Sequence, residues 1–531
     1  MRILLINPFY PISETPSPPL GLAYLAAALE AAGNQVKILD LVVFPYSQTL
    51  LQEVLRDFAP AMVGATAVTM TLDNANQVIR DVKILAPEIV TVMGGPHVTF
   101  CARQTLEACP DLDIVVLGEG EATIVALAKA VMQGSNLEQI QGIVFRKGEA
   151  FCTTPPRDYL ADIETLPLPA RHLLPLGRYR ALGMPISLTT SRGCPFKCIF
   201  CVGRKMVGAK VRYRDPVKIV DEMAYLNTLG FHQVNIADDL FTANKEHCLA
   251  VCDEIRRREL KMKWTSFARV DTVSQDLLTH MRTAGCQAVS FGVESANEQI
   301  LKRIKKGITL DQVINAVNLC NEAGVTPHAS FILGLPGETQ ATLKETVTFG
   351  ERLKKMGVQH GFHLLAPFPG TAVREENEKY DLTILSNNWS EYHANRAICE
   401  TAQVSRQQLD DIVVKWEQDF DKWLGLIERR MARGEADEQE AWQLENLKRI
   451  VVVYDLMMKR TIETRGGIKG NGQQQAPAAA LKELASIAAE AVNPTSFDQV
   501  HQTLKYAFEK GDLKFTRNDS GVTWQWVDFL A

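Results

Sequence analysis

Three cysteines, Cys194, Cys198 and Cys201, lie within eight residues at a spacing of Cys-x3-Cys-x2-Cys. Three thiolates on so short a loop can each bind a different iron of a [4Fe-4S] cluster. The fourth iron then has no protein ligand, so it can bind and activate another molecule. Zinc usually takes four ligands at paired Cys-x2-Cys spacings, and no second pair follows at a suitable distance. The spacing therefore favours a catalytic cluster over zinc or three incidental cysteines.

The motif Cys-x3-Cys-x-aromatic-Cys resembles the signature of the radical S-adenosylmethionine (SAM) enzymes. Phe200 supplies the aromatic position, and the motif follows an apolar stretch at residues 185–188, which should form a strand. In that family the amino and carboxylate groups of SAM chelate the fourth iron. An electron from the cluster cleaves the sulfonium to give a 5′-deoxyadenosyl radical.

Composition indicates an ordinary globular protein. The chain has 531 residues, enough for two to four domains, with 46% hydrophobic and 22% charged residues. Its net charge of −5 gives no electrostatic reason to expect nucleic acid or an anionic membrane as partner. No apolar run approaches the roughly 18 residues of a membrane span, and the apolar N-terminal stretch is too short for a signal peptide. Eleven cysteines do not suggest disulfides, and a labile cluster needs a reducing compartment, so we predict a cytoplasmic protein.

Residues 1–150 alternate between strand and helix patterns. We predict strands at 2–7, 35–41, 61–69, 89–93 and 113–117, and helices at 22–32, 72–85 and 122–132. This alternation predicts an α/β domain with a Rossmann-like, doubly wound parallel sheet, which binds ligands beyond the carboxyl ends of its strands. Those ends are rich in glycine, so a large flat ligand could approach the backbone closely. No Gly-x-Gly-x-x-Gly follows the first strand, which disfavours a dinucleotide.

Three motifs at 19–21 (Pro-Leu-Gly), 94–97 (Gly-Gly-Pro-His) and 117–121 (Leu-Gly-Glu-Gly-Glu) resemble the cobalamin-binding domain that precedes the radical SAM domain in one large subfamily. The resemblance implies cobalamin contacts from Pro19, Gly21, Thr69, Gly94, Gly95, His97, Gly118, Glu119 and Gly120. Gly94 and Gly95 match the pair that lines the channel for the nucleotide tail. The Asp-x-His-x-x-Gly motif of a lower axial histidine is missing, as is usual in this subfamily. Two alternatives stay open: that His97 serves only loop backbone groups, and that the domain has kept the fold but lost the cofactor.

Residues 151–180, which include prolines at 155, 156, 167 and 169, are predicted to be a linker. In residues 181–390 we expect six strands at 186–190, 233–236, 263–268, 288–293, 328–333 and 361–365. Six such units match the partial (β/α)6 TIM-type barrel of the radical SAM family. Active residues of such barrels collect at the carboxyl ends of the strands.

The resemblance assigns SAM contacts to residues at these strand ends. Asp238 and Asp239 stand where many family members have a Gly-Gly-Glu turn that receives the SAM amino group; a solvated turn or helix cap is the alternative. Glu294 and Ser295 suit a ribose diol. Arg269 is expected to pair with the SAM carboxylate or to bridge strand ends. Phe200 and Leu333, the latter at the end of the fifth strand, complete the predicted SAM set.

Two further groups have less specific interpretations. Arg212, Tyr213 and Arg214 are expected either to cap the site or to form an exposed basic turn. Cys248 and Cys252 share one helix face and are expected to be buried as small hydrophobic residues rather than to bind metal.

Residues 391–531 are predicted to be mainly helical, with helices at 405–432 and 437–465. Trp416, Phe420 and Trp423 recur at helical spacing, with Leu424 and Ile427, and predict a core-facing stripe. Residues 466–480 have the composition of a flexible connector. A short helical pair and a strand near 522–527 should follow, and this region is expected to cover the substrate opening.

The resemblance implies a cobalamin-dependent enzyme that transfers a methyl group to an unactivated carbon of a small-molecule substrate. Its cofactors would be a [4Fe-4S] cluster, SAM and cobalamin, with a reductant such as flavodoxin or ferredoxin. One alternative is an oxidative cyclase of the anaerobic magnesium-protoporphyrin monomethyl ester type. Another is a cobalamin- or redox-sensing protein without turnover. A methylthiotransferase is disfavoured, because residues 1–150 contain only Cys101 and Cys109 and hence no second cysteine triad.

Overall fold

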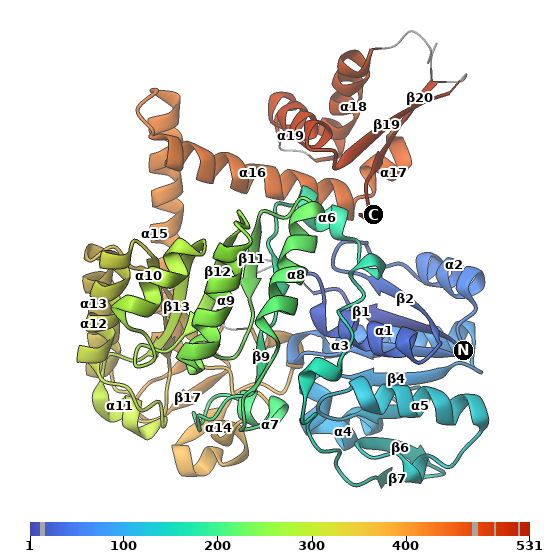
Figure 1. Cartoon of the computed structure of the whole chain (residues 1–531), viewed down its shortest axis with the longest axis horizontal. Helices are drawn as coiled ribbons and strands as arrows, with labels where there is room; N and C mark the ends of the chain where they lie inside the picture. The colour runs from blue at the N-terminus through green and yellow to red at the C-terminus, as the bar shows by residue number, and fades with distance from the viewer. Residues whose placement is uncertain (11–15, 394, 470–475, 493–494, 519–520, 531) are drawn as a thin grey trace.

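The computed structural model describes residues 1–531 except 11–15, 394, 470–475, 493–494, 519–520 and 531. Two parallel sheets, each with its own helices, lie beside one another, and a mainly helical C-terminal region stands above them (Figure 1). The predicted α/β class, with its two parallel sheets and helical C-terminal region, is confirmed. No helix among the described residues is long and apolar enough to cross a membrane.

The first sheet has the strand order β2-β1-β3-β4-β5-β6-β7. Its parallel strands are β1 (Arg2–Asn7), β2 (Gln35–Asp40), β3 (Met62–Thr66), β4 (Val90–Gly94) and β5 (Ile114–Val116). Two antiparallel strands, β6 (Ile143–Lys147) and β7 (Ala150–Thr153), extend it at the β5 edge. The burial of four consecutive residues in β1 explains its unbroken apolar run, because both faces of this sheet are covered by helices.

The helices of this domain are α1 (Leu20–Ala31), α2 (Gln48–Phe58), α3 (Leu72–Leu85), α4 (Pro96–Ala108) and α5 (Glu121–Gln133). Helices α1 and α5 share one apolar cluster, while α2, α3 and α4 pack in the clusters of the other face. Helices α2 and α4 are not among the elements predicted from the sequence. Helix α4 begins directly after Gly94-Gly95, with Pro96 in its first turn, so the turn signal hid a helix start.

The second sheet has six parallel strands in the order β15-β14-β13-β12-β11-β8. They are β8 (Ile186–Leu188), β11 (Gln233–Ile236), β12 (Lys263–Ala268), β13 (Cys286–Glu294), β14 (Thr326–Leu333) and β15 (Gln359–Leu364). Five longer helices lie between them in sequence: α8 (Pro216–Thr228), α9 (Lys245–Arg257), α10 (Gln275–Thr283), α12 (Leu310–Ala323) and α13 (Gln340–Lys355). Strands β8 and β15 do not pair with each other among the described residues, so the barrel is partial, as expected. Cys248 and Cys252 of α9 are fully buried in its core.

The C-terminal region consists mostly of α15 (Arg406–Ala432), α16 (Glu438–Met458), α17 (Thr461–Arg465), α18 (Pro477–Ala491) and α19 (Phe497–Glu509). A small antiparallel sheet, β18-β20-β19, joins Gly467–Lys469, Gly521–Trp526 and Leu513–Asn518. Residues 466–480 are therefore not a connector throughout, because β18 and the start of α18 lie within them; residues 470–475 fall outside the described part.

The prediction that the α15 stripe faces a core is wrong for its aromatic members. Trp416, Phe420 and Trp423 are 44%, 43% and 42% exposed, and their rings contact one another instead. Only Ile427 of the five predicted residues is buried. Helical spacing identified the apolar face correctly, but α15 projects away from the barrel, so nothing in the described chain covers that face (Figure 1).

Helix α6 (Leu176–Ala181), within the predicted linker, ties the three parts together. The fully buried Arg178 donates to the Val43 carbonyl at 3.0 Å and pairs with Asp528 at 2.7 Å and with Glu463. Tyr179 donates to Asp40 of β2 at 2.7 Å. These contacts hold the two sheets in a defined relation, on which the site between them depends.

Candidate active site

The cysteine loop leaves β8 and is held by backbone contacts from two other segments. The Cys194 N–H donates to the Gly208 carbonyl at 3.0 Å, and the Ile199 N–H to the Ile304 carbonyl at 3.1 Å. A Cβ on Gly193, where φ is +125°, would lie 2.4 Å from the Lys210 carbonyl oxygen, so only glycine fits there. Contacts within the chain thus define the shape of the loop.

The three thiols form a donor set that fits a cluster. Cys194 and Cys198 are half-buried and Cys201 is exposed, and burial raises the pKa of each thiol. Within the described part of the chain, no three His, Cys, Asp or Glu side chains gather closely enough to hold one metal ion. A [4Fe-4S] cluster does not need three ligands on one metal ion, because each thiolate binds its own iron. The Gly203 N–H donates to Cys201 Sγ at 3.3 Å, as backbone donors do at cluster sulfurs.

The two predicted aspartates have different surroundings. Asp238 is buried and accepts hydrogen bonds from Thr190 N at 2.6 Å, Thr190 Oγ1 at 2.5 Å and Ser191 Oγ at 2.7 Å. It therefore anchors the start of the cysteine loop. Asp239 lines the cavity described below and lies close to Gly203 and Cys201, where its carboxylate could receive an ammonium group.

Arg269 and Glu294 lie on the other side of the cysteine loop. Arg269 stacks on Phe196, 3.7 Å from the ring centroid, and forms a bidentate pair with Asp271 at 2.9 Å. Glu294 has a φ of +68°, a strained conformation for a residue with a side chain, and pairs with the buried Lys306 at 2.7 Å. Strain of this kind persists at positions that the surrounding structure over-determines, and it commonly marks ligand sites.

Sequence reasoning missed Lys306 and Phe196. Burial raises the pKa of the half-buried Cys198, and the positive charges of Lys306 and Arg269 oppose part of that rise. Lys306 sits in an ordinary Lys-Lys-Gly turn, and only the position of that turn beside the cysteine loop distinguishes it. Phe196 lies inside the motif, between two cysteines, but nothing in the sequence pairs it with Arg269.

Three other predicted SAM residues point into the protein. Ser295 is buried and accepts a hydrogen bond from the Asn297 N–H at 3.2 Å. Leu333 is buried among apolar side chains of α13 and α15. Phe200 is partly buried and packs against the main core. The side chains of Ser295 and Leu333 are fully buried, so a contact of these two residues with SAM would have to come from their backbone.

A cavity of about 500 Å³ lies where the carboxyl ends of the two sheets meet. From the first domain it is lined by the glycine-rich strand ends, including Pro19, Gly21, Gly94, Gly95, Gly118, Glu119 and Gly120. From the barrel it is lined by Thr189, Ser191, Arg192, Ala237 and Asp239. Gly95, with φ +109°, could not carry a side chain, since its Cβ would be 2.7 Å from the Ala67 carbonyl. Of the predicted SAM residues Asp239 lines this cavity, so it faces the same space as the predicted cobalamin residues.

His97 and Thr69 lie outside the lining of this cavity. The His97 Nδ1 is 3.2 Å from Thr69 Oγ1, and its ring meets Trp389 edge-on at 4.8 Å. Burial, with a smaller contribution from Arg374, lowers the pKa of His97 to about 4, so the ring is neutral at pH 7. These contacts join α4 to the segment after the barrel.

Glu119 lines the cavity, but its carboxylate is committed to the barrel. It forms a bidentate pair with Arg212 at 2.8 and 2.9 Å, and both side chains are buried. Arg214 is also buried and pairs with Glu222 at 2.8 Å. Of the two expectations for Arg212 and Arg214, the exposed basic turn is therefore excluded: they lie inside the junction between domains.

Comparisons with known proteins match both halves of this site. Residues 188–350 match the Radical SAM superfamily and residues 13–128 the B12 binding domain. An uncharacterized methyltransferase of Pyrococcus horikoshii is 33% identical over 423 residues, which cover 78% of this chain and 91% of that protein. An anaerobic magnesium-protoporphyrin IX monomethyl ester cyclase of Cereibacter sphaeroides is 33% identical over 362 residues, covering 65% of this chain and 59% of the cyclase. The solved structure of the cobalamin-dependent SAM radical enzyme OxsB, with aqua-cobalamin and SAM bound, shares the fold: its TM-score is 0.68 at 17% identity, over 96% of this chain and 83% of that one.

Proposed function

Because the chain belongs to the B12-binding radical SAM enzyme family, we propose that it transfers a methyl group to an unactivated carbon of a small-molecule substrate. The cofactors typical of this family are a [4Fe-4S] cluster, SAM and cobalamin. A low-potential protein such as flavodoxin or ferredoxin would supply the electrons.

The observation that carries this proposal is the shared cavity. It is lined at once by the glycine-rich ends of the first sheet and by Asp239 beside the cysteine loop. A corrin held by the first sheet and SAM held by the barrel would therefore act on one substrate in one cavity. Such an arrangement suits a reaction that needs both cofactors in a single turnover.

The chain's own residues would bind and orient the cofactors and shield the reacting atoms from water. Cys194, Cys198 and Cys201 would hold the cluster, Asp239 the SAM ammonium and Glu294 the ribose. The bound cofactors supply hydrogen abstraction and a methyl group. The buried pair of Glu119 and Arg212 closes the junction between the domains, so it helps to exclude water from the reacting atoms.

Methyl transfer is favoured over ring closure by the extent of the two matches. The alignment covers 91% of the protein named as a methyltransferase but only 59% of the cyclase, at the same 33% identity. The cyclase is the longer protein, and the part of it that lies outside the alignment is not matched by this chain.

The test needs no knowledge of the substrate. Anaerobically reconstituted protein is incubated with SAM, cobalamin and a strong reductant, and the products are measured by mass spectrometry. We expect S-adenosylhomocysteine, from methylation of cobalamin, together with 5′-deoxyadenosine. Alanine at Cys194, Cys198 and Cys201 should abolish 5′-deoxyadenosine, whereas Cys152→Ala, on β7 away from the site, should not change it.

Each other outcome contradicts part of the proposal. Deoxyadenosine that persists in the triple variant would remove the cluster assignment. Deoxyadenosine without S-adenosylhomocysteine would favour the cyclase alternative. Binding of cobalamin and SAM without either product would favour a sensing protein.

A further inference from the structure

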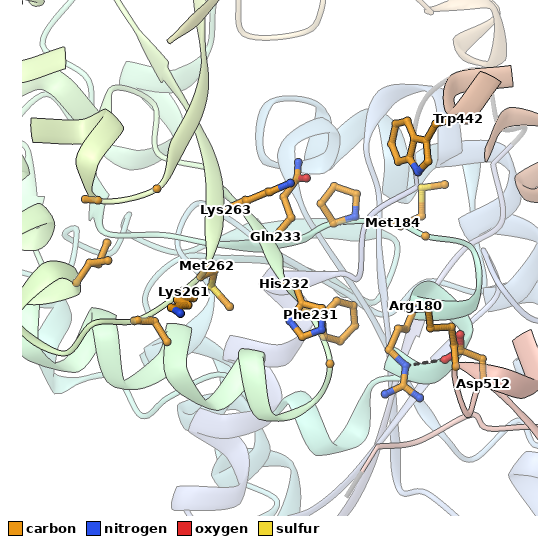
Figure 2. A pocket seen from close by; sticks show the side chains of 18 of the residues that line it. Arg180, Met184, Phe231, His232, Gln233, Lys261, Met262, Lys263, Trp442 and Asp512 are labelled. Atoms are coloured by element: carbon orange, nitrogen blue, oxygen red, sulfur yellow. Dashed lines mark hydrogen bonds and ion pairs between the residues drawn. The ribbon is translucent and has the colours of Figure 1, made fainter. Parts of the chain in front are cut away.

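A second cavity, of about 1210 Å³, lies at the opposite end of the barrel from the cysteine loop. One wall is the amino end of the barrel, with residues that precede or begin β8, β11, β12 and β13, such as Gln233 and Lys263. The other wall comes from the C-terminal region, with Trp442 and Arg449 of α16, Tyr506 of α19 and Asp512. Figure 2 shows Lys261 and Lys263 on the barrel side and Trp442 and Asp512 across from them.

The lining is strongly basic, although the whole chain carries a net charge of −5. Six lining residues are Lys or Arg and two are carboxylates, Glu259 and Asp512. Asp512 is already neutralised, because its Oδ1 accepts from Arg180 Nε at 2.6 Å. Arg180 also donates a hydrogen bond to the Leu229 carbonyl at 2.9 Å. This pair therefore joins the two walls. Arg256 pairs with Asp253 at 3.5 Å, which leaves four lining cations without an ion pair among the described residues: Lys261, Lys263, Arg449 and Lys510.

Two of these cations share one aromatic ring. The Arg449 guanidinium lies 4.0 Å from the centroid of Tyr506, and Lys510 Nζ lies 5.6 Å from the same centroid. Arg449 donates to Asn446, but its buried Nε has no hydrogen-bond partner in the described structure. Two like charges so close together repel each other, and a bound anion would remove that repulsion.

The barrel wall adds two more cations. Lys261 and Lys263 are exposed to the cavity, and no carboxylate among the described residues pairs with either. Cations thus face the cavity from both walls, and Glu259 is the one carboxylate without an arginine partner among the described lining residues. Walls of one sign around a hollow concentrate the field and favour an ion of the opposite sign.

An exposed ring stands beside these charges. Trp442 is 62% exposed and lies seven residues before Arg449 on α16, which places both on one face of the helix. The cavity therefore offers a flat surface for stacking next to donors for an anion. Nucleotides present both groups, a planar base and a chain of charged phosphates.

We propose that this cavity binds a nucleoside polyphosphate. Arg449, Lys510, Lys261 and Lys263 would contact the phosphates, and Trp442 would stack on the base. The site is separate from the shared cavity of the two cofactors, so the proposal does not depend on the reaction catalysed there. Since the ligand would bridge the barrel and the C-terminal region, it would also hold these two parts together.

The probes are ATP, inorganic tripolyphosphate and adenosine, titrated calorimetrically into the full-length reconstituted protein. Saturating SAM is present throughout, so that the adenosyl pocket is filled. We expect ATP and tripolyphosphate to bind and adenosine not to bind. Raising the salt concentration should weaken both interactions, because they are mainly ionic.

Variants separate the two parts of the site. Arg449→Gln and Lys263→Gln should each weaken ATP and tripolyphosphate by about tenfold, the value of one charged hydrogen bond. Trp442→Ala should weaken ATP alone. Lys344→Gln, which removes an exposed lysine of α13 far from the cavity, should change nothing. Lys263 is exposed, so its substitution should leave folding intact.

Several results would overturn the proposal. The proposal is wrong if neither ATP nor tripolyphosphate binds the SAM-saturated protein, or if both bind Arg449→Gln and Lys263→Gln as tightly as the wild type. Adenosine that binds as tightly as ATP would show that phosphates are not recognised. Tighter binding of a single-stranded oligonucleotide than of ATP would assign the cavity to nucleic acid instead.

Discussion

The ion pair between Glu119 and Arg212 joins the first domain to the barrel, and its loss should be measurable as lost stability. Its two hydrogen bonds are 2.8 and 2.9 Å long, and the side chains are only 7% and 6% exposed. Removing one partner of a buried pair costs about 3–5 kcal/mol, because the other charge stays buried. In Arg212→Met, Glu119 would keep the Leu160 N–H at 3.0 Å and Arg192 at 3.6 Å. We therefore expect the lower end, about 3 kcal/mol.

The assay is urea unfolding of the full-length protein, taking the transition in which the first domain unfolds. A double-mutant cycle with Glu119→Gln should give a coupling energy of about 1–3 kcal/mol. Arg103→Met is the matched control, since it breaks a pair with Glu107 that is 3.0 Å long but 76% and 51% exposed. It should cost about 0.5 kcal/mol or less.

Two results would refute the reasoning. If Arg212→Met costs no more than Arg103→Met, the pair does not hold the domains together. If Glu119→Gln releases cobalamin while stability stays unchanged, the carboxylate contacts the cofactor, as the sequence motif first suggested. The same variant thus separates the structural interpretation of Glu119 from the cofactor interpretation.

Three further predictions concern the site and its supporting residues. Glu338 accepts hydrogen bonds from the Gly334 and Leu335 N–H groups, and burial raises its pKa to about 8 from 4.5. Between these two pH values the folded protein keeps a proton that the unfolded chain has lost. The free energy of unfolding of the wild type, measured with urea, should therefore fall relative to that of Glu338→Gln as the pH is raised from 4.5 to 8. Gly95→Ala should lose cobalamin on gel filtration and about 2 kcal/mol of stability, because φ is +109° and the new Cβ would meet backbone atoms. Gly21→Ala is the control: it has open space around its Cβ and should keep its stability. Lys306→Met leaves Glu294 buried without its partner, so it should cost about 3 kcal/mol and weaken SAM binding in equilibrium dialysis.

Most of the fold follows from local patterns. Five predicted strands of the first domain and six of the barrel appear in the structure within a few residues of their expected ends, because a buried parallel strand is a short apolar run with turn residues after it. The cysteine loop and the glycine-rich strand ends were also predictable, since each is a contiguous motif. Helix α4 was not, because its start coincides with a turn signal.

The roles of single polar residues were less predictable, because a partner distant in sequence decides them. Asp238 and Asp239 are neighbours in one acidic turn. Asp238 is buried and accepts hydrogen bonds from Thr190 and Ser191, whereas Asp239 faces the cavity. Glu119 sits in a motif that suggested a cofactor contact, and its partner Arg212 lies 93 residues further along. Periodicity has the same limit on α15, where it identifies an apolar face without showing whether anything covers it.

This difference explains why one end of the barrel could be predicted from the sequence and the other could not. The carboxyl ends of the strands carry short motifs, since each loop there brings several functional residues at once. The basic cavity at the amino ends is assembled from single residues of separate segments. Arg180 and Asp512, whose pair joins its walls, are 332 residues apart. A ligand site of this kind has no motif, so only the folded chain brings its charges together and shows that Lys261, Lys263, Arg449 and Lys510 have no carboxylate partner in the described structure.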